Sequence, residues 1–129
     1  MTFNLDIVGS AEANPFFREV VATGVHAQVV VMSIPPGGEI GAEVHDHVDQ
    51  VLVFVSGSGF ALLDGERSEV GPGRLVLVPA GTFHNIVNDG AHEMKLYTVY
   101  APPEHAPGTI HRTKAEADAA EAEVKATAR

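Results

Sequence analysis

The chain has 129 residues, 45% of them hydrophobic, and a formal net charge of −9. This length fits one globular domain that buries roughly two thirds of the surface of its unfolded form. The negative charge argues against nucleic acid and against anionic membranes as partners, because both would repel an acidic protein.

The absence of cysteine excludes disulfide bonds, thiolate metal sites and cysteine nucleophiles. It also suits a protein of the reducing cytoplasm. The first ten residues have no basic region followed by an apolar run, so we expect no signal peptide. No apolar segment approaches the ~20 residues that span a bilayer. We therefore expect a small acidic cytoplasmic protein.

The first half of the chain has the pattern of short strands. Residues 16–22 and 26–34 are rich in β-branched and aromatic side chains, and Pro35 and Pro36 end the second segment. Residues 42–47 alternate between polar and apolar, which predicts a strand. Residues 51–55 are continuously apolar, as in a strand that is covered on both faces.

The second half continues in the same way. Residues 60–70 read as a hairpin with Asp64-Gly65 as its two-residue loop, a pair favoured in type I′ turns. Three more strands are expected at 75–79, 84–88 and 94–101. About eight or nine strands with turn signals every ~8–12 residues predict an all-β sandwich or barrel.

The last segment differs in composition. Residues 113–129 are rich in alanine and charged residues, and they begin with Thr113 and Glu116 in the spacing of a helix capping box. We therefore expect a β domain over residues 1–112 and a short C-terminal helical tail over 113–129.

A histidine pair precedes the central apolar strand. His45 and His47 are two residues apart, so in an extended strand both side chains face the same way. If Val48-Asp49 formed a two-residue hairpin loop, Gln50 would stand opposite His47 on the same face. Imidazole is the commonest metal ligand in proteins, and an amide oxygen is a harder donor. The pattern predicts a metal site, with His84 as the natural fourth group because it begins a strand after a tight turn.

At these residues the sequence resembles the cupin superfamily, in its small single-domain form. The second cupin motif, G-x5-P-x-G-x2-H-x3-N, is complete, and its fixed residues are Gly73, Pro79, Gly81, His84 and Asn88. The first motif, G-x5-H-x-H-x3or4-E-x6-G, is partial. It keeps the two histidines and Gly57, but Gln50 replaces the glutamate after a shortened gap and Glu39 stands where the first glycine is expected.

The resemblance implies a conical antiparallel β-barrel, or double-stranded jelly roll, with one divalent transition metal near one end. It implies the ligand role for His45, His47 and His84. It also implies this role for Gln50, although at that position the residue type and the spacing both depart from the motif. Iron, manganese, nickel, copper and zinc all suit an imidazole-rich set. This expected set is neutral and lacks the carboxylate that non-haem iron oxygenases use.

Two functions follow from this expectation. One is a metal-dependent enzyme, an oxygenase or an isomerase or lyase, acting on a small oxygen-rich molecule between Leu52, Phe54 and Phe83 as pocket walls. Its general base is not obvious, and His26 or a metal-bound hydroxide would have to serve. The alternative is a non-catalytic module that binds a metal or small ligand as a sensor or carrier. A barrel with an empty mouth is a third reading, which the complete second motif disfavours.

The same strand also predicts the assembly. If Leu52 and Phe54 face inward, Val51, Val53 and Val55 face outward on the same strand. Outward valines need cover from another sheet, a helix or a second subunit. Together with the frequent dimers of cupins, this predicts a homodimer.

Overall fold

The fold is described from a computed structural model, which covers residues 2–127 and, for side chains, residues 2–123. Within this part of the chain there are two helices and nine strands. In chain order they are α1 (Ile7–Ala13), β1 (Arg18–Thr23), β2 (Gln28–Ile34), β3 (Asp49–Ser56), β4 (Gly59–Leu63), β5 (Glu66–Val70), β6 (Leu75–Val78), β7 (His84–Val87), β8 (Met94–Ala101), β9 (Ile110–His111) and α2 (Lys114–Thr127).

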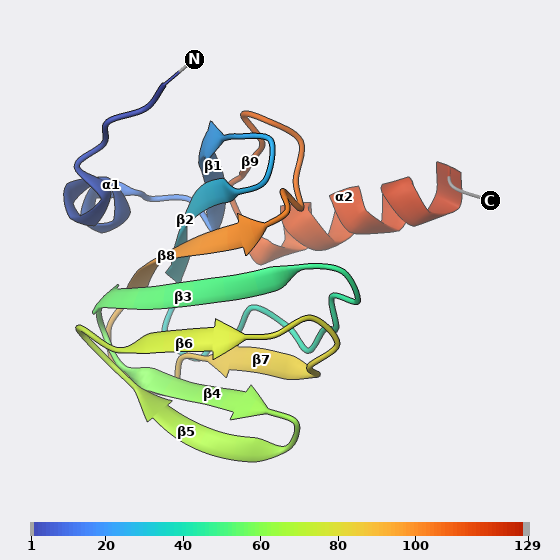
Figure 1. Cartoon of the computed structure of the whole chain (residues 1–129). Coiled ribbons are helices and arrows are strands. Elements are labelled where there is room, and N and C mark those ends of the chain that lie inside the picture. Colours follow the sequence, from blue (N-terminus) through green and yellow to red (C-terminus); the bar gives the residue numbers. More distant parts are fainter. Residues whose placement is uncertain (1, 128–129) are drawn as a thin grey trace.

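The strands form two antiparallel sheets that face each other (Figure 1). The larger sheet has the order β6-β3-β8-β2-β1-β9, and the smaller has the order β5-β4-β7. Alternate residues of β3 and β8 are buried, because one face of the sheet covers the core. The core includes Leu52, Phe54, Ile86 and Leu96, all of them almost fully buried. The expected all-β jelly-roll barrel with a short C-terminal helix is confirmed.

The hairpin expected at residues 60–70 is present with its expected turn. The strands β4 and β5 pair in register up to Leu63 and Glu66. Asp64 and Gly65 have φ angles of 49° and 84°, the positive values that a type I′ turn requires at both central positions. Asp64 also accepts a hydrogen bond from the backbone N–H of Phe83, which ties this turn to the start of β7.

The segment between β2 and β3 differs from the expectation. Residues 42–47 do not form a strand, and Glu43 makes a single antiparallel bridge with His84. The chain bends at Asp46 and His47, and β3 begins at Asp49. The expected loop Val48-Asp49 therefore does not join two strands, because the turn lies one or two residues earlier.

Two elements have no clear signal in the sequence. The helix α1 is only seven residues long and buries only Ala11, so it has no apolar stripe that a periodicity could reveal. It begins at Asp6, whose side chain accepts a hydrogen bond from the N–H of Gly9. The two-residue strand β9 exists because it pairs with β1, at Arg18 and Glu19.

The C-terminal helix is confirmed as α2. The Thr113 hydroxyl accepts from the N–H of Glu116 at 3.1 Å, as the capping box predicts. The Glu116 carboxylate in turn accepts from the N–H of Arg112 at 3.3 Å. The last two residues of the expected segment, 128 and 129, lie outside the described residues. Among the described residues, no helix is both long and apolar enough to cross a membrane.

A pair of glycine substitutions tests how tightly the chain packs where β3 ends beside the start of β8. Gly57 and Gly73 both have a positive φ, at 78° and 83°. A Cβ at Gly57 would lie 2.5 Å from the carbonyl oxygen of Glu93, whereas a Cβ at Gly73 would meet nothing within 4 Å. We expect Gly73→Ala to lower the free energy of unfolding by about 1 kcal/mol, from backbone strain alone. We expect Gly57→Ala to lower it by about 3 kcal/mol or more, because strain and a backbone clash add. Urea denaturation measures both, and equal losses would contradict the close packing at Gly57.

Candidate metal centre

A two-residue backbone bridge brings distant parts of the chain together at one end of the barrel. The N–H of Glu43 donates to the carbonyl of His84 at 2.9 Å, and the N–H of His84 donates back to Glu43 at 3.0 Å. Residues directly opposite each other in an antiparallel pair project their side chains to the same side. The carboxylate of Glu43 is therefore placed beside the imidazole of His84.

His45 joins this pair because it lies two residues after Glu43 in locally extended chain. Its carbonyl accepts a hydrogen bond of 2.8 Å from the N–H of Gly81. Gly81 has a φ of 85° and belongs to the tight turn before β7. The turn at Gly81, which belongs to the second cupin motif, thus holds the backbone of His45, which belongs to the first. The two motifs therefore meet in space.

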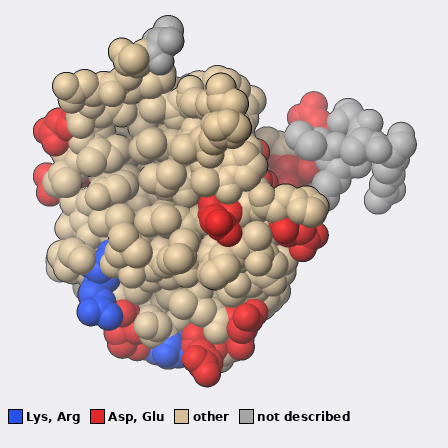
Figure 2. Space-filling model, viewed as in Figure 1, with Lys and Arg blue, Asp and Glu red and all other residues tan. Residues whose placement is uncertain are grey.

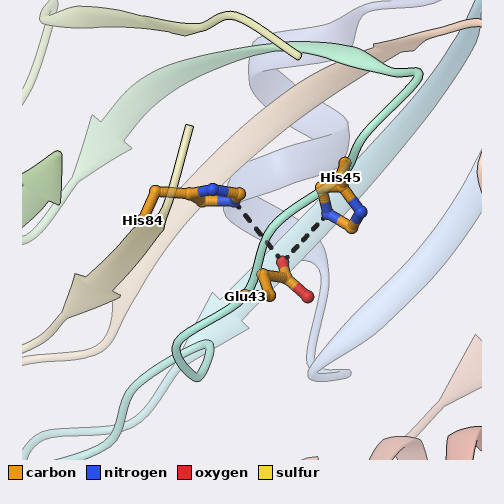
Figure 3. A group of neighbouring side chains, drawn as sticks. All are labelled: Glu43, His45 and His84. Atoms are coloured by element: carbon orange, nitrogen blue, oxygen red, sulfur yellow. Dashed lines mark ion pairs between the residues drawn. The ribbon is translucent and has the colours of Figure 1, made fainter. Parts of the chain in front are cut away.

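The three side chains converge on one point (Figure 3). The distance from Glu43 Oε1 is 3.2 Å to His45 Nε2 and 3.6 Å to His84 Nε2. One potential ligand atom of each residue lies within 4.8 Å of the other two. A metal bonded at about 2.1 Å separates neighbouring ligand atoms by about 3 to 3.5 Å. The spacing therefore fits a shared cation without a large rearrangement.

The second nitrogen of each imidazole has its own partner. His84 Nδ1 lies 2.9 Å from the carbonyl oxygen of Thr82, so Nδ1 carries the proton and Nε2 presents its lone pair. His45 Nδ1 lies 3.5 Å from the carboxylate of Glu104. Both Nε2 atoms are buried, and the one group they face among the described residues is the Glu43 carboxylate, at ion-pair distance but outside good hydrogen-bond geometry. Metal-binding histidines show this arrangement, with the outer nitrogen oriented by a carbonyl or carboxylate. These residues fit a metal ion.

The electrostatics of the group keep the carboxylate charged. Burial would raise the pKa of Glu43, but contacts with His45 and His84 outweigh it and lower the pKa to about 2. The same contact with Glu43 raises the pKa of His45 above its ordinary value, against the opposing effect of burial. Glu43 is thus an anion at any physiological pH, as a carboxylate ligand must be.

The structure does not bring His47 into this group. The residue is exposed and lies in the bend after His45. The expectation that His45 and His47 share a face holds only for an extended strand, and the bend at Asp46 and His47 breaks the alternation. Glu43 takes the third position, so the converging set contains a carboxylate and is not neutral.

Gln50 is buried. Its position is set by strand β3 and not by the expected hairpin loop at Val48-Asp49. It lies on β3 directly opposite Tyr100 of β8, so the two side chains share the inner face of the sheet. Its amide nitrogen donates to the hydroxyl of Thr98 at 3.0 Å, and that hydroxyl donates to the carbonyl of Val51 at 2.8 Å. The amide oxygen of Gln50 is buried without a partner among the described residues.

The expected pocket walls lie elsewhere. Leu52 and Phe54 are part of the hydrophobic core, and Phe83 is 52% exposed at the start of β7. A cavity beside the site has a volume of about 450 Å³ and is lined by other residues. It reaches from the converging group to the loop after β8 and to α2. Its lining includes Phe17, Arg18, Ile40, Glu43, His45, Tyr100, Glu104, His105, His111 and Glu121.

Sequence reasoning missed Glu104 and His105, which face this cavity from the loop after β8. Gln28, fully buried on β2, holds this loop with its side chain. Its amide nitrogen donates to the carbonyl of His105 at 2.7 Å, and its amide oxygen accepts from the N–H of Glu104 and of His105 at 3.2 and 2.9 Å. No local pattern marks these residues, because the anchor lies more than seventy positions earlier.

Glu43 did have a signal in the sequence. It has the same parity as His45 and His47 in the alternating segment 42–47, so extended chain would place it on their face, although it is not among the residues expected in the site. The cupin pattern places its acidic residue after the histidine pair, where this chain has Gln50, and the carboxylate before the pair was not considered. The extended stretch ends after His45, so Glu43 stays on the shared face and His47 does not.

Comparisons with known proteins agree with the fold. The family model described as "Cupin domain" matches residues 30–100, a range that contains Glu43, His45 and His84. The chain is 41% identical over 125 residues to the protein YrkC of Bacillus subtilis, covering 92% of this chain and 67% of YrkC. It is 37% identical over 101 residues to the protein L612 of Acanthamoeba polyphaga mimivirus, covering 75% of this chain and 63% of L612.

One solved structure is similar over nearly the whole chain. The crystal structure of BH2720 from Bacillus halodurans has 41% sequence identity and a TM-score of 0.91, and the match covers 92% of this chain and 95% of BH2720. The chain spans only about two thirds of the length of YrkC and L612. The matched family model covers more than half of the 129 residues. The chain therefore belongs to the cupin family.

Proposed function

We propose that this cupin binds one divalent transition metal through Glu43, His45 and His84 and acts on a small oxygen-rich molecule in the adjoining cavity. The observation that carries the proposal is the convergence of two buried Nε2 atoms on one oxygen of the Glu43 carboxylate, with one potential ligand atom of each residue within 4.8 Å of the others. Two imidazole nitrogens and a carboxylate oxygen gathered at one buried point are the donor set that holds a divalent transition metal.

Two imidazoles and one carboxylate form a set that non-haem iron oxygenases and zinc hydrolases both use. When bound there, the metal would act as a Lewis acid towards substrate oxygens at its open positions. The amide oxygen of Gln50 is proposed as a further neutral donor, to the metal or to a water on it. The carboxylate of Glu43 offsets one of the two positive charges, which favours retention of the cation.

The cavity also offers groups that can handle protons. Burial raises the pKa of Glu104 above its ordinary value, partly offset by the nearby His45. Burial and the charge of Arg18 lower the pKa of His105 to about 4, so its imidazole stays neutral. A carboxyl with a raised pKa suits general acid–base catalysis. These groups favour an enzyme over a non-catalytic sensor or carrier, and Glu104 fills the role that was sought in His26, which is exposed on the turn between β1 and β2.

The ligand set is tested by metal analysis of single variants. We expect one divalent metal per chain in the wild-type protein, and a loss of at least ~90% of it in His84→Ala and in Glu43→Gln, because each removes a ligand. His47→Ala serves as the matched control and should keep full occupancy. Inductively coupled plasma mass spectrometry measures the metal, and circular dichroism verifies that the barrel remains folded.

The same set of variants contains the contradicting result. One contradicting result is a folded Glu43→Gln protein that keeps its full metal content while the His47→Ala protein loses its metal. That result would show that His47, and not Glu43, is the third ligand. The wild-type protein is also incubated with iron, manganese, nickel, copper and zinc in turn. If it binds none of them, the metal centre itself is refuted.

The contribution of Gln50 has its own test. We expect Gln50→Leu to weaken metal affinity by about tenfold, the scale on which donors and orienting partners at metal sites act. Thr98→Val keeps the amide but removes the hydroxyl that holds its nitrogen, so its effect should be smaller. Competition with a fluorescent chelator measures both affinities. If the metal affinity of Gln50→Leu equals that of the wild-type protein, the amide oxygen does not contribute to metal binding.

We also propose that the chain forms a homodimer through the outer face of the larger sheet. β6 is an edge strand of this sheet, and its outward residues Leu75 and Leu77 are 61% and 55% exposed. They stand opposite Val53 and Val51 of β3, so the four side chains form one apolar patch. On the face shown in Figure 2, charged side chains lie mostly towards the margins. An uncovered apolar patch next to a free strand edge favours pairing with a second copy.

Charge substitutions test the dimer. We expect Leu77→Glu to convert the protein from dimer to monomer, because a dimer would then bury two carboxylates in an apolar interface. Val25→Glu is the matched control, since Val25 is 83% exposed in the turn between β1 and β2, away from this patch. Size-exclusion chromatography with light scattering gives the mass. A wild-type monomer, or a Leu77→Glu dimer, would contradict this interface.

A further inference from the structure

One charged side chain on the inner face of the barrel has no counter-ion. Arg18 begins β1, is only 8% exposed and lines the cavity beside the proposed metal centre. Its Nη1 donates to His111 Nδ1 at 3.3 Å across the β1–β9 pair. Its Nε is buried without a partner, and Arg18 forms no ion pair with any carboxylate in the part of the chain whose side chains are described.

A guanidinium in this position is expensive to keep. Arginine is charged at every accessible pH, so it cannot escape burial by losing its proton. Removing such a charge from water costs several kcal/mol unless an opposite charge and hydrogen bonds compensate for it. His111 and the Tyr100 hydroxyl supply neutral contacts, and neither carries an opposite charge. The positive charge therefore stays largely uncompensated, and Arg18 meets the cavity as one of its lining residues, so an anionic ligand in the cavity can supply the missing opposite charge.

The position of Arg18 relates it to the metal centre. Arg18, Glu43 and His45 line the same cavity of about 450 Å³, a size that suits a small molecule. Arg18 is near enough for its charge to act on the pKa values of His45 and Glu104. Among the lining residues it is the single lysine or arginine, and Glu104, Asp118 and Glu121 are acidic.

We propose that Arg18 binds a carboxylate of the substrate, so that the substrate is a small monocarboxylate with an oxygen substituent directed to the metal centre. Only the contact between the oxygen substituent and the metal centre rests on the proposed function. A planar carboxylate matches the fork of a guanidinium. Four acidic residues, Glu43, Glu104, Asp118 and Glu121, line the same cavity as this one cation, and their repulsion disfavours a phosphate dianion more than a singly charged carboxylate.

The test compares two probes that differ only in having a carboxylate or a neutral amide. Lactate and lactamide share the same carbon skeleton and hydroxyl group, and only lactate carries a carboxylate. Binding is measured by NMR titration of the zinc-loaded protein. We expect lactate to bind at least about tenfold more tightly than lactamide, the ratio that a charge-assisted hydrogen bond supports. Inorganic phosphate should bind more weakly than lactate, and tighter binding of phosphate would overturn the assignment of a carboxylate.

Variants assign this preference to Arg18. Arg18→Met should remove the preference for lactate over lactamide, and Arg18→Lys should keep part of it because it retains charge but not the fork. Arg74→Met is the matched control for net charge, since Arg74 is exposed on the turn before β6 and should leave the preference unchanged. If Arg18→Met does not fold, Arg18→Lys decides the question, and a full wild-type preference in a folded Arg18 variant overturns the proposal.

A metal-free variant separates this inference from the proposed function. In His84→Ala the Arg18 contact is intact, so some preference for lactate over lactamide should persist although both probes bind more weakly. A protein that binds no metal but still discriminates through Arg18 would refute the metal centre and support the anion site. A protein that binds metal but shows no preference for lactate over lactamide would support the metal centre and refute the anion site at Arg18.

Discussion

The site depends on one pair of backbone hydrogen bonds, between Glu43 and His84. This isolated bridge joins the segment before β3 to the start of β7, two stretches about forty residues apart in the chain. Because opposed residues in an antiparallel pair share a side, the bridge alone puts a carboxylate against an imidazole. His45 follows by the alternation of extended chain, and the turn at Gly81 holds its carbonyl. Further backbone hydrogen bonds along the same two segments, such as that from the N–H of Ile40 to the carbonyl of Ile86, support the bridge.

The fold was largely predictable from local patterns. Alternation, apolar runs and turn residues located the strands from β1 to β8, and the Asp64-Gly65 loop predicted its own turn type because both residues tolerate a positive φ. α1 and β9 were not predictable in the same way. Their stability comes from packing and pairing with strands far away in the sequence, and their own residues carry no periodic signal.

The site was predictable in part, for a related reason. His45 and His84 stand at positions that the motif spacing marks, and both reach the converging group. His47 matches the motif equally well but lies after the bend at Asp46, where alternation no longer applies. Glu43 required the bridge to His84, which is a tertiary contact. Glu104 and His105 required the buried clamp of Gln28, for which the sequence offers no local indication.

The cavity combines a proposed cation site with a fixed cation and several carboxylates. Glu43 is held ionised, with its pKa lowered to about 2, while burial raises the pKa of Glu104. Two carboxyl groups with opposite shifts are suited to different tasks, ligation for one and proton transfer for the other. Arg18 adds a fixed positive charge in the same enclosed space. The cavity is thereby suited to bind, orient and exchange protons with a small charged molecule.

The most direct test of the central claim is a crystal structure of the protein after metal loading, with diffraction collected at the absorption edge of the metal. The account predicts an anomalous peak within bonding distance of Glu43 Oε1, His45 Nε2 and His84 Nε2, at about 2.0 to 2.2 Å from each. A peak bonded to His47 in place of Glu43, or a peak on surface carboxylates with none between the two buried imidazoles, would contradict it.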